Sequence, residues 1–383
     1  MTIAEILSNE ELRQHEFPVT KNKIFLAHAA VCPLPRRVAE AVRDYAARST
    51  QGEQEEIMSA VHIQKARAVA AKLLGAQTEE IAFVGPTSLA LSFVASGLPW
   101  RKGDNLLLYY DDYPSNVYPW TALAERGVEA RLLNIKEYGR IRAVDIIGQV
   151  DEQTRMVALA SNHFVAGYRP DTAAIGKALR ERNILFCVDG IQTVGAFPAS
   201  LQYVDFLAAD AHKWLLGPCG AGIFYVQKSI QAKLKPMAYG WHNVRCPNFV
   251  AQEQLVFPPD ARRYEAGSAN LFGLVGLNAA MELLLEIGVE NIAARLLHLR
   301  GLLVPALQSK GWTVLQADAP KENASAIVSF YRPGADLPAL REKLLAAHIE
   351  VSLRTDRKGQ HYIRVSPHFY NTDEEIHRLL ENL

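Results

Sequence analysis

Residues 209–226, ADAHKWLLGPCGAGIFYV, place a His-Lys pair between two apolar runs. The runs VDFLA (204–208) and GIFYV (222–226) are short and apolar, as buried strands are, so Lys213 would lie between two core strands. A lysine that loses its water must be paired or lose its proton, and a lysine with a depressed pKa is the amine that traps a carbonyl group. The alternative is a lysine in a turn whose ammonium group reaches solvent.

Similar apolar runs precede this stretch, and helix-like segments such as DTAAIGKALRERN separate several of them. Strands that alternate with helices over some two hundred residues predict a mostly parallel α/β sheet covered by helices on both faces. After about residue 257 a long helical pattern and several short strands predict a smaller α+β domain. We therefore expect a large domain at 20–257 and a small C-terminal domain at 258–383, joined by the N-terminal segment 1–19.

The carboxyl ends of these strands, where ligands of such sheets gather, carry polar residues. Asp189 ends the apolar run ILFCVDG, and a carboxylate there is expected to meet a cation. The run IAFVG leads through Pro86 into a helix whose first turn carries Thr87 and Ser88, and such a helix start suits a phosphate. A phosphate pocket, a strand-end carboxylate and a buried lysine together describe a pyridoxal phosphate site, in which the carboxylate keeps the pyridine nitrogen protonated.

Composition narrows the partners of the chain. Its 383 residues hold 41 Lys plus Arg and 41 Asp plus Glu, without a basic run, so neither nucleic acid nor anionic lipid is implied. The N-terminus is amphipathic and acidic and no apolar stretch reaches the ~18 residues of a membrane span, so we expect a cytoplasmic protein. Four separated cysteines without CxxC spacing predict neither a disulfide framework nor a metal site. GPCGAG precedes a strand instead of opening a helix, which argues against a nicotinamide oxidoreductase.

Taken together, the chain resembles the fold-type I pyridoxal phosphate enzymes of the class V aminotransferase group, which includes cysteine desulfurases, selenocysteine lyases and isopenicillin N epimerase-like proteins. The resemblance covers nearly the whole chain and implies a large domain with a mostly parallel sheet of the seven-stranded type. The stretches that carry it are LAHAAVCPLP, GPTSLALSFVA, YPSNVYPW, ASNHFVAGYRPD, VDGIQTVG, DAHKWLLGP, YEAGSANLFG and IRVSPHFYNTDEEI.

The resemblance also implies roles for individual residues. Lys213 corresponds to the Schiff-base lysine, Asp189 to the partner of the pyridine nitrogen, and Arg364 to the arginine that clamps the substrate α-carboxylate. Tyr113 stands where relatives commonly have a histidine stacked on the cofactor ring, and its aromatic face can still stack. The remaining implied cofactor contacts are Asn162 and Gln192 near the ring hydroxyl, and Thr87, Ser88 and His212 at the phosphate.

In GSAN, Gly267 and Ser268 resemble a segment that reaches the cofactor phosphate of a second subunit, which implies a homodimer with shared sites. The alternative is an ordinary helix cap. On the substrate side, Arg354 is either a second substrate contact or a solvated loop cation. His28 is a further candidate for contact with the amino-acid substrate, and Trp241 and His242 are candidate pocket residues.

The reaction is less well defined than the cofactor. Desulfurases carry a nucleophilic cysteine in the loop before the substrate arginine, and this chain has none between Arg354 and Arg364. Cys32 is the remaining substitute, the alternative being a buried, idle thiol. We therefore favour aminotransfer or epimerase-like chemistry at Cα over a selenocysteine or cysteine C–S(e) lyase. A protein that binds pyridoxal phosphate without turnover is the third hypothesis.

Overall fold

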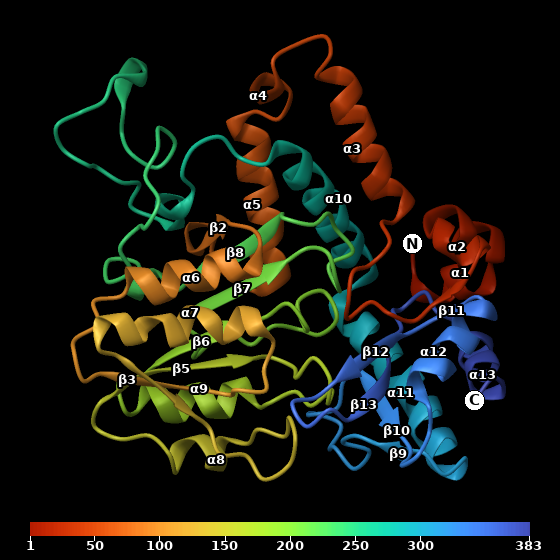
Figure 1. Cartoon of the computed structure of the whole chain (residues 1–383). Coiled ribbons are helices and arrows are strands. Elements are labelled where there is room, and N and C mark those ends of the chain that lie inside the picture. The colour runs from red at the N-terminus through yellow and green to blue at the C-terminus, as the bar shows by residue number, and fades with distance from the viewer.

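The computed structural model describes residues 1–383, and its centre is a seven-stranded sheet in the order β2-β8-β7-β6-β5-β3-β4 (Figure 1). Only β8 runs antiparallel to its neighbours. The predicted mostly parallel α/β sheet is thus confirmed. The strands are β2 (Ile81–Phe83), β3 (Asn105–Leu108), β4 (Glu129–Leu132), β5 (Thr154–Ala160), β6 (Leu185–Asp189), β7 (Phe206–Asp210) and β8 (Gly222–Val226).

Helices cover both faces of this sheet, which is why its central strands are continuous apolar runs. Side chains that alternate along the strands divide between two cores: in β5, Met156 and Ala158 pack with α6 and α7, whereas Val157 and Leu159 pack with α5, α8, α9 and α10. The helices of this part are α3 (Arg36–Arg48), α4 (Gln54–Ile57), α5 (Ala60–Leu74), α6 (Thr87–Gly97), α7 (Tyr118–Thr121), α8 (Ala143–Ile147), α9 (Thr172–Arg180) and α10 (Leu271–Ile287).

A second, antiparallel sheet of four strands in the order β12-β13-β10-β9 lies beside the first and has its own apolar core (Figure 1). Its strands β12 and β13 lie near loops of the large sheet, so side chains of the two sheets can share a site. The elements are α11 (Val289–Ser309), β9 (Thr313–Val314), β10 (Val328–Tyr331), α12 (Leu337–Ala346), β11 (Ile349–Glu350), β12 (Ser352–Thr355), β13 (His361–Val365) and α13 (Asp373–Glu381).

The N-terminal segment packs against the C-terminal part of the chain. Helices α1 (Ile3–Ser8) and α2 (Glu10–Glu16) precede the short strand β1 (Ile24–Phe25), which pairs in parallel with β11. Arg13 of α2 forms a buried ion pair with Glu375 of α13 at 2.8 Å. The domain boundaries at residues 19 and 257 stay predictions.

No single helix has both the length and the apolar composition to span a membrane. Helices α10 and α11 meet that test only together, across a 77° bend. Most of the apolar residues of α10 are buried in the protein core.

Candidate active site

Lys213 lies three residues beyond the end of β7 and is only 6% exposed. Burial lowers its pKa to about 8, and the neighbouring Asp189 carboxylate opposes part of that shift. Its Nζ lies 5.1 Å from the centre of the Tyr113 ring. The lysine is therefore the desolvated amine that the sequence predicts, and the alternative of a solvated turn lysine is wrong.

Asp189 is the last residue of β6 and is 2% exposed. Its Oδ1 accepts a hydrogen bond from the backbone N–H of Ile191 at 3.1 Å, and its other carboxylate oxygen accepts none. Burial raises the pKa of this carboxyl, while the Ile191 N–H and Lys213 lower it. One carboxylate oxygen is therefore free to accept a proton-bearing group of a ligand.

Asn162 and Gln192 lie together beyond β5 and β6, but only Asn162 has a free polar atom. Asn162 is fully buried and its Oδ1 has no hydrogen-bond partner. The Gln192 side chain instead donates to the carbonyl of Ala29 at 3.1 Å and accepts from the Trp214 indole at 2.8 Å. Gln192 therefore holds the residue next to Lys213, a role that sequence reasoning missed.

The start of α6 lies against the end of β7. The Thr87 hydroxyl accepts from the backbone N–H of Asp210 at 2.9 Å, and the backbone N–H groups of Thr87 and Ser88 have no acceptor. His212 shares a 2.7 Å contact between its Nδ1 and the Asp210 carboxylate, which leaves its other ring nitrogen free. A Cβ at Gly85 would lie 2.8 Å from the backbone of Gly220, so only glycine allows this approach. These unpaired donors are the groups that an anion site needs, and the roles of Thr87, Ser88 and His212 at the phosphate stay predictions.

Two arginines of the second sheet complete the site. Arg364 in β13 is 1% exposed, donates to the Phe164 carbonyl at 2.7 Å, and burial lowers its pKa well below the ordinary value. Arg354 in β12 is half-buried, and burial lowers its pKa as well. The Nε of each is buried without a hydrogen-bond partner. Neither arginine has a carboxylate within 4.0 Å.

Comparison with known proteins bears on this arrangement. The aminotransferase class-V family profile matches residues 24–379. The chain belongs to the class-V aminotransferase family. It is 29% identical to a probable cysteine desulfurase of Methanothermobacter thermautotrophicus, over 98% of each chain, and 27% identical to an uncharacterized aminotransferase of Bacillus subtilis, over 98% and 97%.

Solved structures of other proteins have the same fold. An apo cysteine desulfurase from Thermococcus onnurineus superposes with a TM-score of 0.89 at 22% identity, over 100% of this chain and 97% of the other. A cystine C–S lyase in complex with cysteine persulfide superposes with a TM-score of 0.86 at 23% identity, over 95% and 98%. The predicted pyridoxal phosphate fold type I is thereby confirmed.

Pyridoxal phosphate is the cofactor of this class-V enzyme, and the unpaired groups of the site fit it. The free oxygen of Asp189 suits a protonated pyridine nitrogen, and the orphaned Asn162 Oδ1 suits the ring hydroxyl. The start of α6 suits the phosphate, and the Lys213 amine suits the aldehyde. No group of three or more His, Cys, Asp or Glu side chains is placed to hold a metal ion.

His28 and Cys32 are not available to a substrate in this structure. His28 is fully buried, and its ring nitrogens contact the carbonyl of Ser366 at 3.0 Å and the hydroxyl of Tyr370 at 2.7 Å. The geometry therefore contradicts a direct contact between His28 and substrate, because both nitrogens are already used. Burial raises the pKa of the Cys32 thiol to about 12, so a thiolate is not populated near neutral pH.

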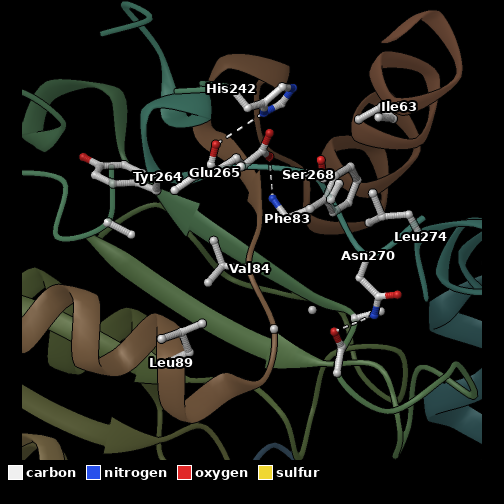
Figure 2. Close-up of a pocket in the computed structure, with 18 of the residues that line it drawn as sticks. Ile63, Phe83, Val84, Leu89, His242, Tyr264, Glu265, Ser268, Asn270 and Leu274 are labelled. Atoms are coloured by element: carbon white, nitrogen blue, oxygen red, sulfur yellow. Dashed lines mark hydrogen bonds between the residues drawn. The ribbon is translucent and has the colours of Figure 1, made fainter. Parts of the chain in front are cut away.

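Gly267, Ser268 and His242 line a different cavity of about 310 Å³, between β2, the start of α6 and residues 264–270 (Figure 2). Glu265 closes one side of it, where its carboxylate accepts from the Phe83 N–H at 2.6 Å (Figure 2). Neither Lys213 nor Asp189 lines this cavity. Trp241 is exposed and packs on His242 and Phe249, so within one chain these predicted contacts are not brought to the lysine.

Asp112 is a functional candidate that the sequence analysis did not identify. It is buried, and its carboxylate accepts from the backbone N–H groups of Tyr113 at 2.7 Å and Ala160 at 3.0 Å and from the Asn116 side chain at 3.0 Å. Burial raises its pKa to about 7, and the nearby Asp189 charge adds to the shift. Asp112 thus fixes Tyr113 to the end of β5. The acidic residue directly before Tyr113 was the only sequence signal.

Proposed function

We propose that this class-V enzyme is an aminotransferase that removes and transfers the amino group of an amino acid. The observation that carries the proposal is the buried Lys213 amine beside Asp189 and Arg364, in a site without a thiol nucleophile. When bound, pyridoxal phosphate supplies a ring that accepts the electron pair released at the substrate Cα. Every other part of the reaction falls to residues of the chain.

Each residue has a distinct part in that reaction. Arg364 binds the substrate α-carboxylate, because its Nε is buried and unpaired and a planar guanidinium holds a carboxylate by two parallel hydrogen bonds. This contact sets which bond at Cα faces the base. The Lys213 amine, with a pKa near neutrality, takes the proton from Cα and returns it elsewhere. Asp189 holds the proton on the pyridine nitrogen.

A C–S lyase is the second candidate, because several relatives are named cysteine desulfurase or probable cysteine desulfurase. The loop at 355–360 contains no cysteine and Cys32 is buried as a thiol, so such a lyase would release sulfur without a protein persulfide from those positions. Epimerisation at Cα needs the same lysine and differs only in where the proton returns. These reactions are separated by their products.

The assembly that we propose is a homodimer with shared sites. Two features support it. Gly267 and Ser268 line a cavity that Lys213 of their own chain does not line, as expected of residues that serve a partner. The segment between β8 and α10 extends away from the body at the upper left of Figure 1 and exposes large apolar side chains. These are Met237, Tyr239, Trp241, Phe249, Val250, Leu255 and Val256. Sedimentation equilibrium of the holoenzyme gives the mass, and a monomer at micromolar concentration would contradict this part of the proposal.

The test of the reaction is a panel of amino acids mixed with the holoenzyme. The cofactor absorbance is followed together with the release of keto acid, sulfide and racemised amino acid. Aminotransfer predicts keto acid together with the amine form of the cofactor, whereas sulfide or a racemised product would replace aminotransfer by lyase or epimerase chemistry. Lys213→Ala is expected to lower turnover by about 10²–10⁴-fold, the contribution of a general acid–base. The matched control Lys228→Ala, at an exposed lysine, should leave turnover unchanged.

A further inference from the structure

Arg354 and Arg364 lie on the same face of the β12–β13 pair. Ser352 is directly opposite Arg364, and Arg354 is directly opposite Tyr362. Opposite residues of an antiparallel pair share a face, as do residues two apart along a strand. The two arginines are therefore diagonal neighbours, whose Cα atoms in such pairs lie roughly 7–8 Å apart. Two guanidinium groups of like charge thus project from one small patch.

Neither guanidinium is neutralised by the protein. Arg364 makes hydrogen bonds only to the carbonyl of Phe164 and, at 3.4 Å, to the hydroxyl of Ser352. The Nη1 of Arg354 has a single contact, 3.4 Å to the carbonyl of its neighbour Leu353. Removing a guanidinium group from water without a counter-charge is costly. Here a fully buried and a half-buried guanidinium lie side by side, each with an unpartnered Nε, which indicates a site that is completed by anions.

A third arginine of the β12–β13 hairpin, Arg357, does have a carboxylate partner within the protein. Arg357 pairs with Asp111 at 2.5 Å and stacks over the Tyr110 ring at 3.5 Å. It is half-exposed and would be adequately solvated without a partner. Arg354 is more buried than Arg357 and nevertheless has no carboxylate. Of these two arginines, Arg354 would gain more from a carboxylate partner, and it is the one that has none.

The charges around the Lys213 amine also indicate that the site binds anions. Arg354 and Arg364 both lower the pKa of Lys213, so the three cations lie close enough to repel one another. Asp189 is the carboxylate that opposes them most strongly. The phosphate of the cofactor belongs to the start of α6, on the large sheet. An α-carboxylate on Arg364 would still leave Arg354 without an anion.

We propose that the substrate is an amino acid whose side chain carries a second anionic group, a carboxylate as in aspartate or glutamate, and that Arg354 binds this group while Arg364 binds the α-carboxylate. The inference rests on the proposed function, because it assigns the substrate class of that same site. It also predicts the length of the substrate. Two carboxylates bound by neighbouring guanidinium groups are separated by a few carbon atoms.

Amine-free dicarboxylates test the second anion site without turnover. Succinate and glutarate are titrated calorimetrically into the holoenzyme, beside succinamate and glutaramate, which replace one carboxylate by a neutral amide of the same shape. We expect at least one dicarboxylate to bind about 10-fold or more tightly than its monoamide, the size that a charge-assisted hydrogen bond brings. Equal dissociation constants for both pairs would overturn the proposal.

Variants then assign the preference to Arg354. Arg354→Gln should bring the ratio of monoamide to dicarboxylate dissociation constants close to one, and Arg354→Lys should keep part of it. Lys358→Gln removes an exposed charge from the same hairpin and should leave the ratio unchanged. If Arg354→Gln weakens dicarboxylate and monoamide equally, Arg354 serves the α-carboxylate and the proposal is wrong. Circular dichroism of each variant verifies that it is folded.

Turnover distinguishes failure of this inference from failure of the proposed function. We expect kcat/KM for aspartate or glutamate to exceed that for asparagine or glutamine about 10-fold or more, and Arg354→Gln to remove the difference. A holoenzyme that converts neutral amino acids equally well would keep the proposed function and overturn the acidic substrate. An Arg354-dependent preference for dicarboxylates without conversion of any amino acid would instead keep the anion site and overturn the aminotransferase.

Discussion

Arg67 and Arg364 are both almost fully buried, at 2% and 1% exposure, yet their surroundings differ completely. Arg67 in α5 forms two bonds to the Glu265 carboxylate, at 2.6 and 3.0 Å, and a third to the carbonyl of Ile81. Arg364 in β13 has no carboxylate at all. The charge of Arg67 is neutralised within the folded chain, whereas the charge of Arg364 is neutralised only when an anionic ligand binds.

This difference separates two uses of the same side chain. A paired buried arginine joins elements of the fold, here α5, β2 and the segment that carries Glu265. An unpaired buried arginine weakens the empty protein and thereby favours binding of an anion. Neither burial nor residue type alone identifies a binding residue. Arg364 stands out because it lacks a counter-charge and its buried Nε also lacks a hydrogen-bond partner.

The largest effect is expected at the paired arginine. Arg67→Met leaves the buried Glu265 carboxylate without its cation, and breaking such a pair costs about 3–5 kcal/mol. The free energy of unfolding in urea should fall by that amount. The double variant Arg67→Met/Glu265→Gln should recover part of the loss, and a loss below 1 kcal/mol in the single variant would remove the contrast with Arg364.

The next largest effect on stability is expected at Lys213, because burial disfavours its protonated form. Because its pKa is about 8 in the folded protein and about 10.4 in an unfolded chain, the unfolded state binds more protons between these values. Stability of the cofactor-free protein should therefore rise with pH across this window. Lys213→Met should gain about 3 kcal/mol over the wild type at pH 7 and nothing above pH 10.5. A difference that is constant with pH would contradict the depressed pKa.

A smaller effect is expected at Asp112, whose carboxylate is the acceptor in all three of its hydrogen bonds to other residues. In Asp112→Asn an NH2 group replaces one of the two accepting oxygens and faces an N–H donor. At least one hydrogen bond is therefore lost, at a cost of about 1–3 kcal/mol. Thermal unfolding should register this loss, and the fluorescence or chemical-shift signature of Tyr113 should change with it. Asp44→Asn, at an exposed carboxylate that pairs only with Arg43, provides the control.

The smallest effect is expected at Arg364 itself. Arg364→Met loses one good hydrogen bond, to Phe164, but strands no carboxylate and removes an unpaired buried charge. We expect the free energy of unfolding to change by less than about 1 kcal/mol, in contrast to Arg67→Met. Substrate binding, measured in parallel, should be lost. A destabilisation as large as that at Arg67 would show that Arg364 is a structural residue.

The sequence predicted the parts of the site that depend on local pattern. Lys213 and Asp189 could be predicted because a charged residue next to an apolar strand can be recognised from the sequence alone. The start of α6 could be predicted because hydroxyl side chains follow a glycine-proline turn. The hydrogen bonds that Gln192, His28 and Asp112 make could not be predicted, because their partners Trp214, Tyr370 and Ala160 meet them only in the folded chain. The same limit applies to β1, since two residues carry no periodicity.

The pairing of β1 with β11 joins Ile24 to Ile349, close to the two ends of the chain. During synthesis the ribosome releases residue 24 long before residue 349, so this contact waits until translation is almost finished. The strands of the large sheet leave the ribosome earlier and can assemble while the chain still grows. The arginine hairpin, which follows β11 directly, is therefore among the last parts to be positioned. A ribosome that stalls shortly before residue 349 would hold a lysine and its sheet without the arginines that recognise the substrate.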